Sequence, residues 1–234
     1  MEKEIRPIAY IRTDFPTKFG IPRQSGVVSR LQGKIYFEKE FSNPDMLRGI
    51  EGFSHIWLIW GFSENEKEGW SPTVRPPRLG GNERMGVFAT RSPFRPNGLG
   101  MSCVRLEGIE KEKGRGCVLI VSGIDMMDNT PIYDIKPYLP YSDSYPDAKG
   151  GFTENREFKT LEVVFPEKLL NCLPAEKREA AVYVLSQDPR PGYHRDESRE
   201  YGIFFADYNL KFKVCDGILT VCAAEKCSDA EYEK

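Results

Sequence analysis

The sequence has few of the residues that build metal sites. It contains only two histidines, His55 and His194, and its six cysteines form no Cys-x-x-Cys pair. Because protein zinc sites are usually made from closely spaced ligands of these two types, we expect no metal and free thiols. No segment approaches the roughly 18 consecutive apolar residues of a membrane helix, so we expect no membrane partner. The first residues, Met1 to Ile5, lack the regions of a signal peptide, which predicts a cytoplasmic protein.

The chain also lacks a strong overall charge. Its 33 basic and 35 acidic residues give a formal net charge of -2, so any nucleic-acid surface must be a local patch. In contrast, 40% of the 234 residues are hydrophobic and 12% are aromatic. This composition excludes a disordered chain and can form a substantial folded core.

The first half of the sequence is predicted to be mainly β. Pro and Gly separate short apolar runs, and few windows have helical periodicity, which favours a barrel or a curled antiparallel sheet. One short helix is expected at Asn43-Pro44-Asp45, because asparagine is a good N-cap and proline fits the first helical position. The expected strands cover residues 5–11, 33–37, 54–62, 84–89, 101–106 and 117–121.

The sequence changes character after residue 161. Residues 175–185 form the only long amphipathic helical pattern, and Asp216-Gly217 is typical of a two-residue hairpin turn. The segment 142–157 is rich in Ser, Asp, Gly and Pro and has no apolar periodicity. We therefore predict a first domain over 1–145 and a small α+β domain over 158–234. The strands expected in the second domain cover 161–165, 201–206, 209–215 and 218–223.

A block of arginines is the most informative segment. Residues 75–95 contain five arginines and a single acidic residue, Glu83, for a local charge of +4. The planar guanidinium group suits phosphate and carboxylate ligands, and the prolines in this loop leave little entropy to lose on binding. The alternative is a solvated loop with internal ion pairs. If the block binds RNA, we expect the contacts to come from Arg75, Arg78, Arg84 and Arg95.

Other segments are less specific when they are taken one at a time. Arg23 and Gln24 offer hydrogen-bond donors in a loop shaped by Gly and Pro. His55 begins an apolar strand, where a structural role is the more common one. Asp128 to Pro131 is typical of a turn, after which Asp134 and Lys136 lie two residues apart on one face of an extended segment and could form a salt bridge. No strand is followed by Gly-x-Gly-x-x-Gly, which disfavours a Rossmann fold.

The order and wording of these segments resemble the TrmO (TsaA-like) family of tRNA threonylcarbamoyladenosine N6-methyltransferases. The resemblance rests on Ile21-Pro22-Arg23-Gln24, on Phe53-Ser54-His55-Ile56-Trp57 and on the block from Arg75 to Asn97. It continues over 128–138 and 187–193. Residue 98 is a departure, because Gly98 stands where many relatives carry proline and leaves the loop before Leu99 freer.

The resemblance implies a single-sheet β-barrel methyltransferase domain, followed by the small C-terminal domain. It implies a homodimer that binds S-adenosyl-L-methionine near the subunit interface. The substrate it implies is threonylcarbamoyladenosine beside the anticodon of tRNA, such as threonine tRNA, in the anticodon loop. The cofactor contacts carried over are Pro22, Arg23, Gln24, His55, Ile56, Arg91, Leu99, Asp128, Asn129, Thr130 and Pro131.

Methyl transfer from a sulfonium fits a chain that has neither a metal motif nor a nucleophile motif. The donor is already electrophilic, so the protein mainly aligns donor and acceptor. Asp134, water or a carboxylate of the substrate could take the proton from the acceptor nitrogen, and we assign no catalytic base. Two other classes stay open: a non-enzymatic RNA-binding β-barrel, and a hydrolase that uses Cys103 or Ser92 as its nucleophile.

Overall fold

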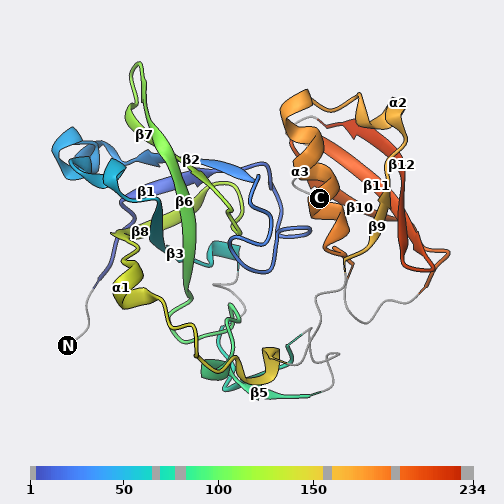
Figure 1. The fold of residues 1–234 in the computed structure, drawn as a ribbon, viewed down its shortest axis with the longest axis horizontal. Coiled ribbons are helices and arrows are strands. Elements are labelled where there is room, and N and C mark those ends of the chain that lie inside the picture. Colours follow the sequence, from blue (N-terminus) through green and yellow to red (C-terminus); the bar gives the residue numbers. More distant parts are fainter. Residues whose placement is uncertain (1–3, 65–68, 77–82, 155–159, 191–195, 228–234) are drawn as a thin grey trace.

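The computed structural model describes residues 4–64, 69–76, 83–154, 160–190 and 196–227. This part of the chain is mainly β, as the sequence predicted, with a larger N-terminal sheet and a smaller C-terminal sheet (Figure 1). Within these ranges, no helix has the length and apolar character needed to cross a lipid bilayer.

Six strands of the N-terminal half pair in the closed order β1-β2-β7-β6-β3-β8. Every neighbouring pair is antiparallel, and the β1–β8 pairing closes the ring, so the sheet has no free edge. Side chains along β6 alternate between inside and outside at its start, as expected for a strand with one buried face. The strands are β1 (Ala9–Arg12), β2 (Gln32–Phe37), β3 (His55–Gly61), β6 (Leu99–Glu112), β7 (Gly116–Ser122) and β8 (Thr130–Pro137).

The interior of this sheet contains large aliphatic side chains. Ile11, Ile35, Ile56, Leu58 and Leu119 are fully buried. Burying apolar area of this kind stabilises a fold by about 25 cal/mol per Å², which makes this core the main source of stability of the N-terminal half.

One glycine determines how an aromatic side chain packs between two of the strands. A Cβ atom on Gly100 would lie 2.4 Å from the indole of Trp60, so only glycine lets this ring lie over β6. In that position Trp60 donates a hydrogen bond from Nε1 to Ser102 Oγ over 2.9 Å. The same Ser102 hydroxyl donates a hydrogen bond to Asp125.

The structure corrects three local expectations. The segment 84–89 is a strand only at β5 (Met85–Gly86), which pairs with β4 (Thr73–Val74) and is followed by the 3-10 helix η6 (Val87–Ala89). The strand β8 was expected only as a turn and an extended segment, because Pro131 and the preceding turn residues hide its pattern. The third correction concerns the first strand, which was expected over residues 5–11 and is β1 over Ala9–Arg12. The short helix predicted after Asn43 is present as the 3-10 helix η2 (Pro44–Leu47).

Asn43 caps η2 as predicted, since its Oδ1 accepts from the backbone N–H of Asp45 over 3.0 Å. Two more 3-10 helices flank it, η1 (Lys39–Phe41) and η3 (Ile50–Gly52). Further along the chain, α1 (Pro140–Asp143) and η7 (Gly151–Thr153) lie in the segment that connects the two sheets.

The C-terminal unit is a four-stranded sheet packed with a helix, which is the predicted α+β arrangement. The strand order is β10-β11-β12-β9, with β9 parallel to β12. The hairpin turn falls at Asp216 and Gly217, which have φ values of 49° and 79°. The elements are β9 (Glu162–Val164), α2 (Glu167–Leu170), α3 (Ala175–Ser186), β10 (Tyr201–Phe205), β11 (Tyr208–Cys215) and β12 (Ile218–Lys226).

Candidate cofactor and RNA site

Two of the predicted cofactor residues, Gln24 and Arg91, are in direct contact. Arg91 donates from Nη1 to Oε1 of Gln24 over 2.5 Å. Gln24 in turn donates from Nε2 to the backbone oxygen of Arg23 over 2.6 Å. Arg91 and Arg23 are exposed, whereas Pro22 is buried. The loop after β1 and the loop before β6 therefore present two cations on one surface.

Asp125 belongs to the same candidate site, although no motif in the sequence marks it. Its Oδ1 accepts from Ser102 Oγ over 2.6 Å, and Ser102 is the residue that also binds Trp60. Burial raises the pKa of the Asp125 carboxyl, while bonds from Ser102 and from the Ser25 backbone and the nearby charge of Arg91 oppose this rise. Asp125 thus interacts with both loops, through the backbone of Ser25 in the loop after β1 and the charge of Arg91 in the loop before β6. Local sequence offers little signal for it, since its partners lie far away along the chain.

The predicted turn at Asp128–Pro131 lies against β1. The carboxylate of Asp128 accepts from the backbone N–H of Thr13 over 2.8 Å and forms an ion pair with Arg12 at 3.1 Å. Asn129 has a φ of 61° and is exposed, while Thr130 is 2% exposed. Asp128 and Thr130 therefore hold the turn in shape, and Asn129 is its most accessible side chain.

His55 and Ile56 lie at the start of β3, at the opposite end of this strand from Leu99. Leu99 pairs with Gly61 at the last residue of β3, whereas His55 is the first. Six residue steps at about 3.3 Å each separate these two ends by about 20 Å. Ile56 is fully buried, so only its backbone faces a ligand. Within one chain, the predicted cofactor residues therefore form two groups rather than one.

His55 has structural partners at its own end of the strand. Its Nδ1 lies 2.9 Å from Ser54 Oγ, its backbone oxygen accepts from Tyr138, and the two rings meet edge to face at 6.2 Å. These contacts fix the orientation of the imidazole and leave part of it exposed.

The described arginines of the block, Arg75, Arg84, Arg91 and Arg95, lack the internal ion pairs that the solvated-loop alternative requires among the residues that the structure describes. In the described part of the chain, no carboxylate lies within 4.0 Å of Arg75, Arg84, Arg91 or Arg95. Arg84 donates to Thr73 Oγ1 over 2.6 Å, and Arg95 donates to the backbone oxygens of Thr90 and Ser92. Arg78 lies outside the described residues.

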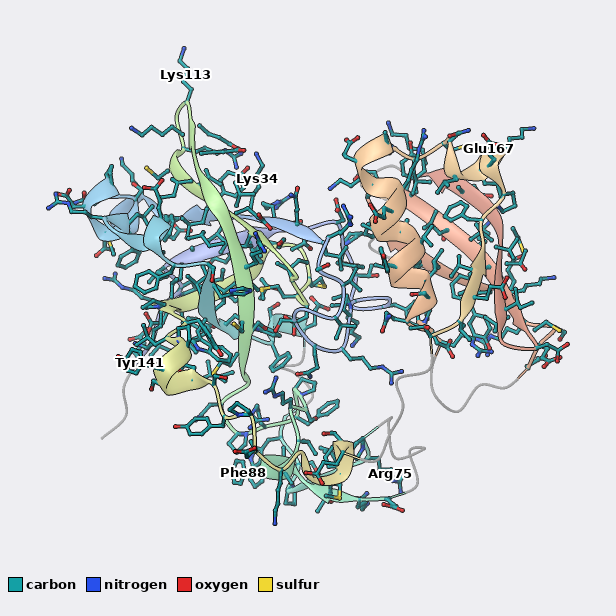
Figure 2. The ribbon with its side chains drawn as sticks, viewed as in Figure 1. Lys34, Arg75, Phe88, Lys113, Tyr141 and Glu167 are labelled. Atoms are coloured by element: carbon teal, nitrogen blue, oxygen red, sulfur yellow. The ribbon has the colours of Figure 1, made fainter. Side chains whose placement is uncertain are left out.

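Figure 2 shows Arg75 in the same lobe as Phe88, at the opposite end of the N-terminal half from Lys113. Phe88 is 80% exposed and Trp70 is 60% exposed. Exposed aromatic rings beside guanidinium groups are the features on which splayed RNA bases stack.

The residues considered for other chemistry are occupied or unreactive. Asp134 forms a salt bridge with Lys136 at 3.0 Å, so this lysine competes for its carboxylate. Burial raises the pKa of the Cys103 thiol, and the nearby charge of Asp143 adds to this rise, which disfavours the reactive thiolate. Ser92 Oγ accepts from the backbone of Phe94. These observations argue against the hydrolase alternative.

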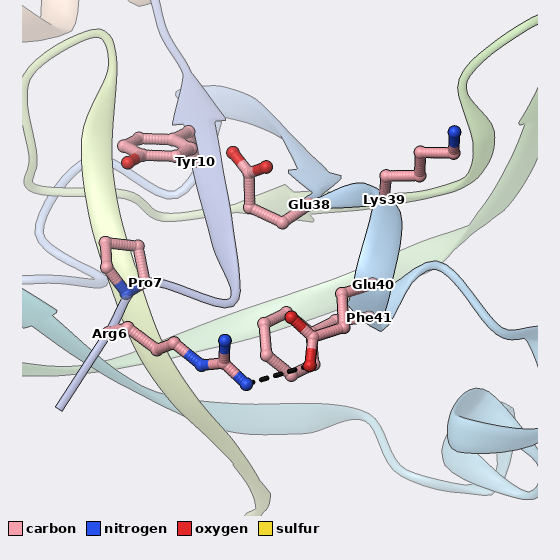
Figure 3. A pocket seen from close by; sticks show the side chains of 7 residues that line it. All are labelled: Arg6, Pro7, Tyr10, Glu38, Lys39, Glu40 and Phe41. Carbon is pink, nitrogen blue, oxygen red and sulfur yellow. Dashed lines mark hydrogen bonds and ion pairs between the residues drawn. The ribbon is translucent and has the colours of Figure 1, made fainter.

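Two further features lie away from these groups. A shallow pocket is lined by Arg6, Pro7, Tyr10, Phe41 and the segment 38–40, with Arg6 paired to Glu40 at 2.8 Å (Figure 3). In the C-terminal unit Glu197, Cys215 and Asp216 cluster on the surface. None of the predicted cofactor or RNA residues belongs to either feature.

The fold and the site together define a class: a mainly β protein, unrelated to the Rossmann architecture, whose cationic loops suit anionic ligands. The chain belongs to the TrmO family. The family model for the tRNA-methyltransferase O N-terminal domain matches residues 10–144, and that for the TrmO C-terminal domain matches residues 159–227.

Individual relatives agree with this assignment. The tRNA (adenine(37)-N6)-methyltransferase of Escherichia coli K12 is 40% identical over 230 residues, which cover 95% of this chain and 97% of that protein. A putative S-adenosylmethionine-dependent methyltransferase of Pseudomonas aeruginosa is 40% identical over 90% of this chain and 92% of its own length. A crystal structure of TrmO superposes with a TM-score of 0.78 at 32% identity, covering 96% of this chain and all of that one. A non-enzymatic RNA-binding protein finds no support among them.

Proposed function

We propose that this protein is an S-adenosyl-L-methionine-dependent methyltransferase that modifies N6 of an adenosine in tRNA. The observation that carries this proposal is the near full-length similarity to a relative named as a tRNA (adenine(37)-N6)-methyltransferase. The Gln24–Arg91 contact supports it, as do the described arginines of the 75–95 block, which have no acidic partner among the described residues, because these groups offer positive charge to a cofactor and to RNA.

The side chains present fit this cofactor. Arg23 and Arg91 can donate hydrogen bonds to its carboxylate, and the Asp125 carboxylate near Arg91 adds a negative charge close to a ligand that carries a sulfonium. The cofactor, when bound, supplies an activated methyl group. The protein then has to orient the acceptor nitrogen and exclude water, which requires neither a metal nor a covalent nucleophile.

The specific adenosine that we propose as substrate is threonylcarbamoyladenosine on the 3′ side of the anticodon, for example in threonine tRNA. This group adds a carboxylate to a base in a single-stranded loop, and an arginine can bind a carboxylate through two hydrogen bonds. Arg75 is exposed and makes no hydrogen bond or ion pair with the described residues, so it is available for this role.

We also propose that residues 1–145 form a β-barrel methyltransferase domain and residues 158–234 a separate C-terminal domain. The protein then acts in the cytoplasm as a homodimer. The separation of His55 from Leu99 within one chain supports a cofactor site shared between two subunits.

The activity is tested by incubating the protein with total tRNA and methyl-labelled cofactor, followed by nucleoside analysis. Label in N6-methylated threonylcarbamoyladenosine is expected, and label in another nucleoside or none would contradict the proposal.

The shared site is tested by mixing inactive His55→Ala and Arg91→Ala subunits, because random pairing restores one intact site in half of the dimers. We expect about a quarter of wild-type activity. No recovery after mixing would refute subunit sharing.

A further inference from the structure

The connection between β1 and β2, residues 13–31, lies between the N-terminal sheet and the C-terminal unit (Figure 1). Its apolar side chains enter the C-terminal core. The rings of Phe15 and Phe205 are 5.5 Å apart, and both are fully buried. Gly20 has a φ of 91°, and a Cβ atom there would lie 3.2 Å from Ile203 Cγ2. The two units therefore share one core at this connection.

Polar contacts hold the same connection at both of its ends. Lys177 of α3 donates from Nζ to Asp14 Oδ2 over 2.6 Å, and these side chains are only 29% and 17% exposed. The backbone oxygen of Asp14 also accepts from Ala206 in the turn after β10 over 3.0 Å. At the far end, Arg30 pairs with Glu179 of the same helix at 2.8 Å.

The opposite side of the connection is held by the N-terminal sheet. The backbone N–H of Gly26 donates to the Gly123 oxygen over 2.8 Å, and that of Ser25 donates to the Asp125 carboxylate. Gln24, which orients Arg91, lies in the middle of this clamped segment. Neither unit alone supplies all of the contacts that fix it.

We infer that the C-terminal unit positions the cofactor loop, with Lys177 as a positioning residue that acts through Asp14. This inference rests on the proposed function, because it assigns the loop to S-adenosyl-L-methionine. A loop that is already ordered loses less conformational entropy when it binds a ligand, so the C-terminal unit raises cofactor affinity without touching the cofactor. Lys177 is not a catalytic residue.

The test compares Lys177→Met with Lys211→Met in the full-length protein. Lys211 forms an ion pair with Glu225 at 2.9 Å inside the C-terminal unit and does not contact the connection, so it is a matched control. Leaving the partly buried Asp14 without its cation should weaken S-adenosyl-L-methionine binding about five- to tenfold in calorimetry. Hydrogen exchange of residues 18–26 should accelerate by a similar factor. Lys177→Arg should restore both, and Lys211→Met should change neither.

Hydrogen exchange separates the failure of this inference from the failure of the proposed function. Unchanged exchange of residues 18–26 in Lys177→Met would overturn the clamp. Faster exchange with unchanged cofactor affinity would overturn its link to binding. A wild-type protein that does not bind the cofactor would overturn the proposed function, while the exchange comparison would still decide whether the C-terminal unit orders the loop. Thermal unfolding of each variant checks that the C-terminal unit stays folded, and Arg30→Ala offers a milder second probe at the other end.

Discussion

Arg91 and Gln24 are 67 positions apart in the sequence, yet the guanidinium of Arg91 donates to the side-chain oxygen of Gln24 over 2.5 Å. The bond joins the loop after β1 to the loop before β6. It uses one edge of the guanidinium and leaves the others to face outward, so Gln24 determines the direction in which Arg91 presents its remaining donors.

Replacement of Gln24 by alanine should therefore weaken cofactor binding, although the positive charge of Arg91 remains. We expect the dissociation constant of S-adenosyl-L-methionine to rise about tenfold, the range for loss of one hydrogen bond to a charged group. Gln24→Glu should retain most of the affinity, since its carboxylate can still accept from Arg91. Gln32→Ala, at the exposed first position of β2, is the control. Equal affinities of Gln24→Ala and wild type in calorimetry would contradict the proposed orienting role.

Replacement of Arg75 or Arg78 by alanine should weaken tRNA binding more than cofactor binding. Removing one arginine that binds a phosphate should flatten the plot of log affinity against log salt by about 0.7 unit for single-stranded RNA. Lys113→Ala removes the same charge at the opposite end of the N-terminal half, so it controls for net charge (Figure 2). If Arg75→Ala and Lys113→Ala gave the same affinity and slope, the arginine block would be only a solvated surface.

Asp125 should make a pH-dependent contribution to stability. Burial raises the pKa of its carboxyl in the folded state, so the stability it contributes is present below the ordinary carboxyl pKa and is lost as pH rises through the raised one. Asp125→Asn, which cannot ionise, should be at least as stable as wild type near neutral pH, and its advantage should shrink toward about pH 4. Its cofactor affinity should fall, because the carboxylate near Arg91 is lost. Denaturant titrations over this pH range check the first effect, and an advantage that grew with acid would contradict it.

The regular strands and the long helix could be predicted because their signals are local. The continuous apolar run around Leu58 and the Asp216-Gly217 turn specify structure within a few residues. β8 was missed as a strand because its stability comes from pairing with β1 and β3, which compensates for the proline at its second position. Tertiary pairing overrides local propensity in such cases.

The candidate site was likewise predictable only where its signals are local in the sequence. The loops with Gln24 and Arg91 could be identified through the family resemblance, but their contact could not be derived from spacing. Asp125 has no motif, and its importance comes from Ser102, Trp60 and the Ser25 backbone, which only the folded chain brings together. The roughly 20 Å separation of His55 from Leu99 was equally hidden, because it follows from the pairing of β3 with β6.

Cofactor binding should not require a metal. The described residues offer one cluster of possible ligands, Glu197, Cys215 and Asp216, and it lies in the C-terminal unit away from the cofactor loops. Calorimetry in the presence of a chelator should give the same S-adenosyl-L-methionine affinity as calorimetry in its absence. Cys215→Ser should also bind normally. Binding that appeared only with added zinc or magnesium would contradict the proposed site.

The final prediction concerns substrate choice: methylation should require a threonylcarbamoyl group already installed on the adenosine. A site built to bind that carboxylate with an arginine leaves the arginine unpaired when the group is missing, and such sites discriminate by about a hundredfold to a thousandfold in rate. The measurement compares one threonine tRNA prepared fully modified with the same tRNA from cells that cannot make the modification. Arg75→Ala should lose much of this preference by slowing the modified substrate more than the unmodified one, whereas Lys113→Ala should keep it. Equal methyl incorporation into both tRNAs by the wild-type protein would show that the carboxylate is not recognised and that the protein methylates adenosine more generally.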